Sequence, residues 1–297
     1  MPKYSVAHSL LKAINEQGLE KGIAHYESIK NDHAYHLDEH ELNMVSYELL
    51  KADQGKSAIA VLELAIASFP NAFNLYDSHG EIFRKLGNEA AAIKSYKKSI
   101  SINPKNDNDL KMLKELGVDI DKESLYLLKT DKCWTKEIFT FPLHFAKGLD
   151  YEGTEEAHFP KGCRDTESPE FWSYAFAWNI NLTTKLSEAE MEDRIQIYFD
   201  DIMNVVNKQK DRILPKSIAN LDQTDNGEDV SKFAGAIDVH DSFVTRESMR
   251  LYVQAESHYC EQQKKSIILF RFSPKEFNHE IWLKLENIIL GDDACRT

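Results

Sequence analysis

Basic residues and long apolar runs are scarce in this chain of 297 residues. Its 36 Lys and Arg are outnumbered by 49 Asp and Glu, which gives a net charge of −13. Because contacts with phosphates need clustered Lys and Arg, this balance argues against a nucleic-acid partner. No stretch approaches the roughly 20 apolar residues that cross a bilayer, so we expect no membrane span. Glu16 interrupts the N-terminal apolar run, which is untypical of a signal peptide. We therefore expect a cytoplasmic protein, or a periplasmic one if an export signal is missing from this chain.

Cysteines and cofactor motifs are also few. The four cysteines lie far apart in the sequence without a CxxC pair, which argues against a local zinc knuckle: Cys133, Cys163, Cys260 and Cys295. Their even number permits disulfides, but without an export signal free thiols are the expected state. The chain has no P-loop, no Rossmann glycine pattern, no H-E-x-x-H and no G-x-S-x-G. We therefore predict no cofactor and no catalytic residue, and favour a protein that is not an enzyme.

Charge and strand pattern both change near residue 120. Residues 1–120 carry 14 basic and 17 acidic side chains, a net charge of −3, which leaves −10 for residues 121–297. Segments with strand-like alternation begin only after about residue 137. We therefore predict two domains, 1–120 and 121–297.

The first domain contains a repeat with a period of 34 residues. Five pairs of small or apolar residues share this spacing: Ser46 and Gly80, Ala58 and Ala92, Leu62 and Tyr96, Ala65 and Ser99, and Pro70 and Pro104. Small residues at such positions let two helices cross closely, and Pro104 cannot continue a helix. Since each helix pair leaves an apolar face uncovered, neighbouring pairs must stack.

In period and residue types, residues 73–106 resemble a tetratricopeptide repeat. The resemblance implies helix pairs at about 5–38, 39–72 and 73–106, with a capping helix at 107–117. It also implies a groove lined by the first helix of each pair, in which relatives commonly hold peptides. Matching by register places seven residues in this groove: His40, Asn43, Tyr47, Asn74, Asp77, Glu81 and Arg84. The alternative is that the repeats only pack against the second half of the same chain.

The second domain is predicted to be α+β, with an antiparallel sheet and helices on one face. We expect an edge strand over 139–146, a strand over 171–180, and a meander from 233–240, 250–260 and a central strand at 265–272. Ser187 and Glu190 form a capping box that starts a helix. The polar run 207–230 is expected to end in a loop, and Ser273-Pro274 to open a last helix.

Two polar clusters are candidate sites. On one face of the predicted meander lie Asp238, His240, Glu256 and His258, which could converge on a ligand; the plainer interpretation is a solvated sheet face. The loop 32–40 contains His33, His36 and His40 beside acidic residues, but it matches no standard metal motif, so we assign no metal site.

Residues 134–288 also resemble an uncharacterised bacterial family of hypothetical proteins. The matching positions are Trp134, Glu137, Phe141-Pro142, Gly153, Glu155-Glu156, Phe159, Phe171-Trp172-Ser173, Cys260, Ser273-Pro274 and Trp282. This resemblance implies a shared fold without a known activity. The sequence thus favours an interaction or scaffold protein that binds a peptide or protein segment in the repeat groove. The alternative is an enzyme or small-ligand carrier with its pocket against the small-residue face of 171–180.

Overall fold

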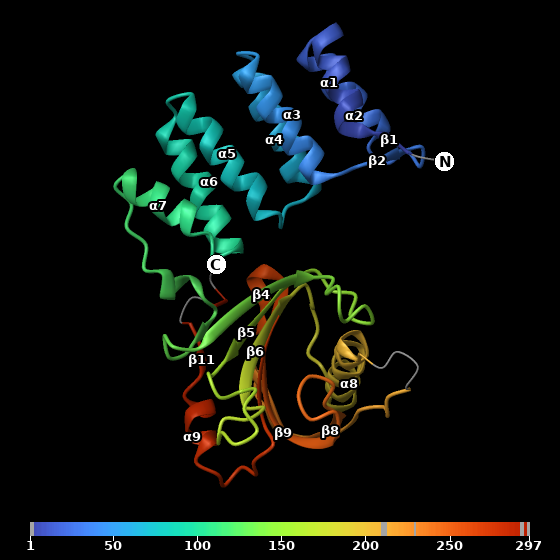
Figure 1. Cartoon of the computed structure of the whole chain (residues 1–297), viewed down its shortest axis with the longest axis vertical. Helices are drawn as coiled ribbons and strands as arrows, with labels where there is room; N and C mark the ends of the chain where they lie inside the picture. The colour runs from blue at the N-terminus through green and yellow to red at the C-terminus, as the bar shows by residue number, and fades with distance from the viewer. Residues whose placement is uncertain (1–2, 209–212, 229, 292–293, 296–297) are drawn as a thin grey trace. The chain divides into compact units, whose positions relative to one another are not determined.

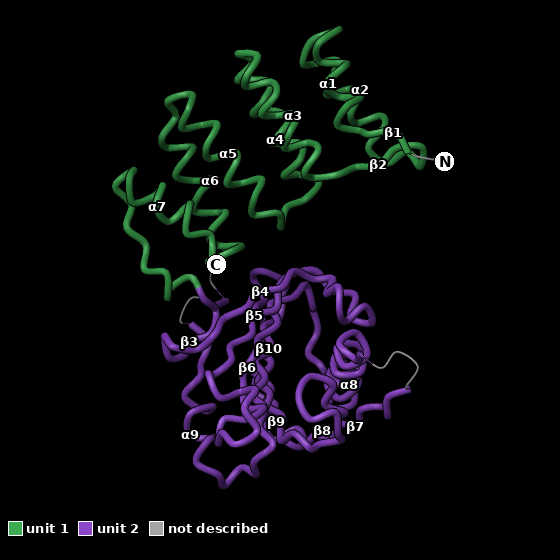
Figure 2. The backbone as a smooth tube through the Cα atoms, in the orientation of Figure 1, with its two compact units in different colours: residues 1–125 green, residues 126–297 purple. Residues whose placement is uncertain are grey.

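The chain forms two compact units, Met1–Leu125 and Tyr126–Thr297 (Figure 2). The structure is a computed structural model that describes residues 3–208, 213–228, 230–291 and 294–295. The division falls after Leu125, whereas the charge pattern placed the boundary at residue 120. Within the described ranges, no helix is both long enough and apolar enough to pass through a membrane.

The first unit consists of stacked helix pairs followed by a single helix (Figure 1). The helices are α1 (Val6–Gln17), α2 (Leu19–Ile29), α3 (Glu39–Lys51), α4 (Gly55–Ser68), α5 (Phe73–Lys85), α6 (Glu89–Ile102) and α7 (Asp107–Glu115). Two short strands, β1 (Tyr4–Ser5) and β2 (Tyr35–His36), pair in parallel beside α1. The helical repeats predicted from the 34-residue period are confirmed.

Small residues let the two helices of each pair approach closely. Ala92 and Ser99 on α6 are both fully buried, and Tyr96 between them is 1% exposed. A Cβ atom at Gly80 on α5 would lie 2.6 Å from the Tyr96 ring, which no real contact permits. The ring therefore fills the space that the glycine leaves, and this packing explains why the repeat needs a small residue at position 80.

The second unit is built on a seven-stranded sheet in which every pairing is antiparallel, in the order β4-β5-β6-β10-β9-β8-β7. Its strands are β4 (Thr135–Phe141), β5 (Gly153–Phe159), β6 (Tyr174–Ile180), β7 (Ile218–Asn226), β8 (Val230–His240), β9 (Ser248–Cys260) and β10 (Lys265–Ser273). A separate pair joins β3 (Leu128–Lys129) to β11 (Ile289–Leu290), and two 3-10 turns span Lys122–Leu125 and Glu261–Gln263. The predicted α+β class, the meander and the central position of β10 are confirmed.

The two helices of this unit cover opposite faces of the sheet. Helix α8 (Glu188–Val206) packs on the face that carries the large residues of β6, such as Phe176. Helix α9 (Ile281–Glu286) packs on the other face, where Ala175 and Ala177 leave room for Trp282. The expectation of helices on one face is therefore wrong in this detail, because the small residues of β6 admit a second, shorter helix.

Strand β7 lies within the polar run 207–230 and extends to Asn226, into the end of the run that we expected to be a loop. Four backbone N–H groups at its outer edge donate to side chains of α8: Ser217 to Asp200, Ala219 to Gln196, Leu221 to Glu192 and Gln223 to Glu188, at 2.7–2.8 Å. The acceptors recur every four residues along α8, a rise of about 6 Å, and the donors every two residues along the strand, a rise of about 6.7 Å. The rows of donors and acceptors therefore have nearly the same spacing. The helix thereby supplies the acceptors that a neighbouring strand would, and protects an otherwise open edge.

Other predicted boundaries shift. The strand expected at 139–146 is β4, which ends at Phe141 before a cis peptide bond to Pro142; its place at the sheet edge is confirmed. Helix α8 begins after Ser187 with the predicted capping box. The last helix, α9, begins at Ile281 and not directly after Ser273-Pro274.

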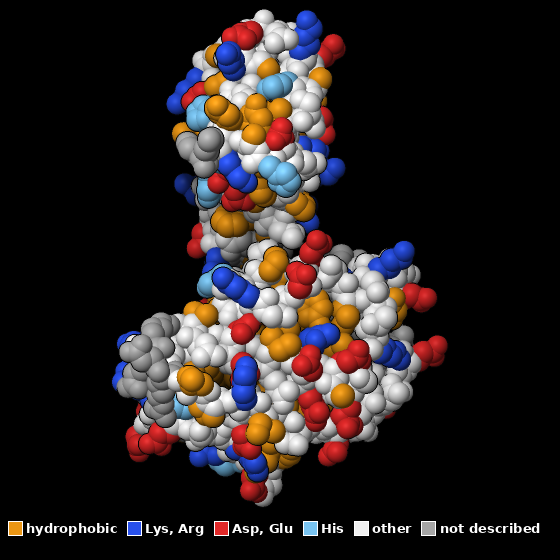
Figure 3. All heavy atoms as spheres, turned by 90° about the vertical axis from the view of Figure 1, so that its right-hand side faces the viewer, with side chains coloured by type: hydrophobic (Ala, Val, Ile, Leu, Met, Phe, Trp, Pro, Cys, Tyr) orange, Lys and Arg blue, Asp and Glu red, His pale blue; other side chains and the backbone are white. Residues whose placement is uncertain are grey.

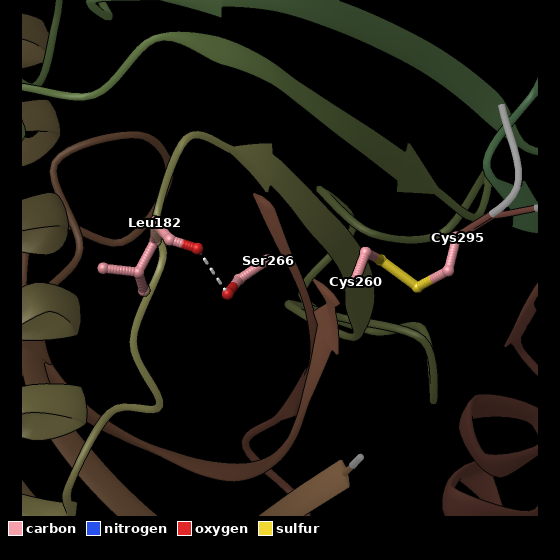
Figure 4. The surroundings of a disulfide bond; sticks show 4 residues. All are labelled: Leu182, Cys260, Ser266 and Cys295. Atoms are coloured by element: carbon pink, nitrogen blue, oxygen red, sulfur yellow. Dashed lines mark hydrogen bonds between the residues drawn. A yellow bond between two sulfur atoms is a disulfide. The ribbon is translucent and has the colours of Figure 1, made fainter. Parts of the chain in front are cut away.

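Two cysteines that we expected to be free thiols form a disulfide. Cys260 at the end of β9 is bonded to Cys295, with 5.2 Å between the Cα atoms (Figure 4). Nearby, the Ser266 hydroxyl on β10 donates to the Leu182 carbonyl at 2.8 Å. Cys133 and Cys163 are free, as expected. The expectation of free thiols was wrong for Cys260 and Cys295. It was based on the lack of a recognisable export signal, whereas the pairing of these cysteines depends on where β9 and the C-terminal segment meet.

Candidate functional site

The predicted groove residues lie on the first helices of the second and third repeats. We call the row formed by His40, Asn43, Tyr47, Asn74, Asp77, Glu81 and Arg84 the repeat face. Its central link runs between repeats: the Tyr47 hydroxyl on α3 donates to Glu81 Oε2 on α5 at 2.5 Å. These residues are 34 apart, so equivalent positions of successive repeats are neighbours in space, as the register predicts.

Charges on the repeat face are largely paired locally. Burial raises the pKa of the Tyr47 hydroxyl, and the hydrogen bond to Glu81 raises it further. Burial also acts to raise the pKa of Glu81, but hydrogen bonds from Tyr47 and Lys85 outweigh it and hold the pKa below its ordinary value. Arg84 donates to Glu115 on α7 at 2.8 Å. The face is therefore polar but close to neutral.

Two positions on this face retain hydrogen-bonding capacity. Asn43 Oδ1 is buried and has no hydrogen-bond partner among the described residues. Asp77 accepts a long hydrogen bond of 3.5 Å from Asn106, and its carboxyl lies beside that of Asp109 on α7. Burial raises the pKa of Asp109 to about 8, and Asp77 adds to this shift. Near neutral pH this neighbourhood thus carries less negative charge than its residue types imply.

The histidines of loop 32–40 do not gather into a metal site. His36 Nε2 lies 3.1 Å from Glu41, and His40 Nε2 lies 3.7 Å from Glu39 with a side chain that is 75% exposed. The described part of the chain contains no group of three or more His, Cys, Asp and Glu placed to hold a metal ion. The acidic Asp38 caps α3 by accepting from the Glu41 N–H.

The four meander candidates do not converge. In the β8–β9 register, Asp238 lies opposite Arg250, eight positions before His258 on β9. Asp238 forms a two-bond ion pair with Arg250, both at 2.7 Å, whereas Glu256 binds the buried Arg271 at 2.6 Å. His240 and His258 lie near opposite ends of the hairpin because antiparallel pairing reverses the order of one strand. The four predicted ligand residues thus form two separate pairs, Asp238 with His240 and Glu256 with His258.

The second unit instead contains a cavity of about 240 Å³ between β4, β5, β6, α8 and the loops at 159–172 and 243–244. Eight aromatic residues line it: Phe139, Phe145, Phe159, Trp172, Tyr174, Tyr198, Phe199 and Phe243. Its polar lining consists of Glu137, His144, Glu155, Cys163 and Arg164. Val205 and Phe243 are 51% and 40% exposed, so the cavity reaches the surface beside them. On the α8 side of this unit, hydrophobic side chains are visible at the surface among charged ones (Figure 3).

This cavity lies against the large-residue face of β6, not the small-residue face that we had considered for a pocket. Tyr174 belongs to the face covered by α8, and the small-residue face is filled by Trp282 and its neighbours. The alternation of β6 was correctly predicted. However, α9 covers the face with small residues, and the cavity lies on the face with large aromatic rings.

Glu155 is the buried polar centre of the cavity. It is 1% exposed, and its two carboxyl oxygens accept hydrogen bonds from Trp178 Nε1 at 2.9 Å and the Tyr198 hydroxyl at 3.0 Å. Burial raises the pKa of Glu155 to about 7; these hydrogen bonds act to lower it, and the nearby Glu137 raises it. The carboxyl can therefore exchange a proton near neutral pH. The adjacent Glu156 points to the opposite face, where it accepts from the backbone N–H groups of Leu127 and Leu128.

Cys163 is a poor candidate nucleophile, because burial raises the pKa of its thiol to about 12. In the sequence, Glu155 and Trp172 stand out only through the resemblance to the hypothetical-protein family. The feature that could have identified Glu155 is the acidic pair Glu155-Glu156 in β5, the strand that pairs with the aromatic-rich β6. Alternation places one of two consecutive acids on the aromatic face, where burial makes it chemically distinctive.

Comparison with known proteins supports the identity of the first unit. Residues 73–106 match the family described as tetratricopeptide repeat. A search of curated proteins found no match to the chain. The matched segment corresponds to α5, α6 and the turn that follows them. The first unit therefore contains a tetratricopeptide repeat within an array of helix pairs, an architecture that indicates protein interaction or a scaffold role.

Proposed function

We propose that the protein binds a peptide or protein segment along the repeat face of its first unit. The observation that carries this proposal is the Tyr47–Glu81 hydrogen bond of 2.5 Å, which joins equivalent positions of successive first helices into one continuous row. Such rows form the extended binding surfaces of helical repeat proteins. A small-ligand role for the second unit is a separate question.

The chemistry of the row favours a segment that offers hydrogen-bond donors. Asp77 is partly exposed on this row, and its carboxyl accepts a long hydrogen bond of 3.5 Å from Asn106. A hydrogen-bond donor of a bound segment would pair with this carboxyl. Because Arg84 and Glu81 already have partners of opposite charge, strong net charge on the segment is not required.

Selection of peptides from a random display library on the full-length protein tests this function. Enriched peptides should lose binding to a Glu81→Lys variant, which removes the acceptor of Tyr47 and places a second cation beside Lys85. Glu63→Lys is the matched control, because Glu63 is an exposed residue on the second helix α4. Circular dichroism confirms that both variants keep their helices.

Equal binding of the enriched peptides to Glu81→Lys and Glu63→Lys would contradict the assignment to the repeat face. Failure of the folded wild-type protein to enrich any peptide would contradict segment binding itself, and would favour the alternative in which the repeats pack only against their own chain.

A further inference from the structure

The cavity of the second unit combines an aromatic wall with acidic groups that lack a cationic partner. Glu155 receives hydrogen bonds from Trp178 and Tyr198, and its charged neighbour is Glu137, a second acid. Within the described ranges, neither acid forms an ion pair with Lys or Arg. A buried carboxylate without a cation is costly, so a cation beside Glu155 would stabilise its ionised form.

Arg164 contacts an aromatic ring at the outer end of the cavity. The guanidinium carbon of Arg164 lies over the Phe243 ring, 5.8 Å from its centroid, at the exposed end of the lining. An anionic ligand would therefore meet the carboxyls of Glu155 and Glu137, with Arg164 and the exposed His144 as the lining residues that can carry positive charge. A neutral apolar ligand would fit the rings but would leave Glu155 without a counter-charge.

Trp172 gives a second, independent indication that the cavity binds a ligand. It is 7% exposed, yet its indole N–H has no hydrogen-bond partner in the described structure. Its backbone has a φ of +50°, in the left-handed region that large side chains avoid. The backbone N–H of Trp172 donates to the Cys163 carbonyl at 2.9 Å and holds this conformation, so these two lining residues are fixed together. Such strain typically persists where it positions a functional side chain.

We propose that this cavity binds an organic cation: a primary amine carried on a ring-sized apolar body. The amine would lie between the carboxyl of Glu155 and the faces of the surrounding rings, which attract cations through their negative π faces. The apolar body would fill the remainder of the cavity. About 150 Å³ is enough to hold benzene, so about 240 Å³ accommodates a ring with a short amine-bearing tail.

Three probes of matched size separate this proposal from its alternatives: 2-phenylethylamine, 2-phenylethanol and phenylacetate. Isothermal titration calorimetry on the full-length protein measures each affinity at a pH above that at which Glu155 ionises. We expect the amine to bind at least about tenfold more tightly than the alcohol, and phenylacetate more weakly than either. Equal affinities for amine and alcohol, preference for phenylacetate, or no binding of any probe at millimolar concentration would overturn the proposal.

Variants locate the binding. Glu155→Gln should reduce the preference for the amine over the alcohol by about tenfold while keeping the alcohol affinity, which also shows that the cavity is intact. Glu137→Gln should reduce the same preference and, because Glu137 is only half-buried, serves if the first variant fails to fold. The matched control is Glu228→Gln, an exposed acid outside the cavity lining. An unchanged preference in both cavity variants would refute the role assigned to the acids.

Discussion

Glu155 should make the stability of the second unit depend on pH, and Glu155→Gln should abolish that dependence. Burial raises the pKa of this carboxyl from the ordinary value of 4.5 to about 7 in the folded protein. Between these values the folded state binds the proton more tightly than the unfolded chain does. The free energy of unfolding therefore falls as pH rises through this window, because the unfolded state releases its proton first.

The size of the effect follows from the two pKa values. The full difference corresponds to about 3 kcal/mol, of which about 2.5 kcal/mol falls between roughly pH 5 and pH 8. Glu155→Gln cannot ionise, so it should lack this loss. Its amide still offers one acceptor, but it cannot accept from both Trp178 and Tyr198, which adds a constant cost of about 1–3 kcal/mol at all pH values. The slope with pH, not the absolute stability, is the decisive quantity.

Urea unfolding followed by tryptophan fluorescence measures how the stability of the second unit changes with pH. All four tryptophans belong to it: Trp134, Trp172, Trp178 and Trp282. Other titrating groups contribute equally to wild type and variant and cancel in the comparison, and Glu228→Gln controls for the loss of one surface acid. The same pH slope in wild type and Glu155→Gln would refute a buried carboxyl with a raised pKa.

Three further predictions concern packing and cross-links. Tyr47→Phe removes the hydrogen bond to Glu81 and should lower the stability of the first unit by about 1–2 kcal/mol in urea unfolding followed by circular dichroism; an unchanged midpoint would show that the bond contributes nothing. Gly80→Ala places a Cβ atom 2.6 Å from the Tyr96 ring and should cost about 1–3 kcal/mol in the same assay, whereas a stabilised variant would contradict the described packing. Cys295→Ser opens a disulfide with a sequence separation of 35 and should destabilise the second unit by up to about 4 kcal/mol. Alkylation of all four cysteines in unfolded, unreduced wild-type protein would show that the disulfide is absent.

The helical repeats could be predicted because their information is periodic and local. Residues 34 apart occupy equivalent places, so the small positions at Gly80, Ala92 and Ser99 indicated both helix pairing and stacking before any contact was known. The same reasoning correctly placed the row that contains Tyr47 and Glu81 on neighbouring helices. The capping box at Ser187 was equally local and marked the start of α8.

Features that depend on two distant segments could not be predicted in this way. Strand β7 is largely polar, and it is held on one side by pairing with β8 and on the other by a row of acceptors on α8 at matching spacing. The meander candidates lie apart for a related reason. The sequence pattern showed which side chains share a face, but the strand register places Asp238 opposite Arg250 and far from Glu256. Pairing of Cys260 with Cys295 likewise required knowledge of where the C-terminal segment lies.

The period of the repeats and the alternating faces of the central strands could be read from the sequence, since each follows from spacing along one segment. The chemistry of the second unit depends instead on how distant segments pack together. Glu155 is an ordinary acid in the sequence; burial among rings from β4, β5, β6 and α8 gives it a pKa near neutrality and a cavity beside it. Burial is a property of all the surrounding elements together, and no single segment carries it.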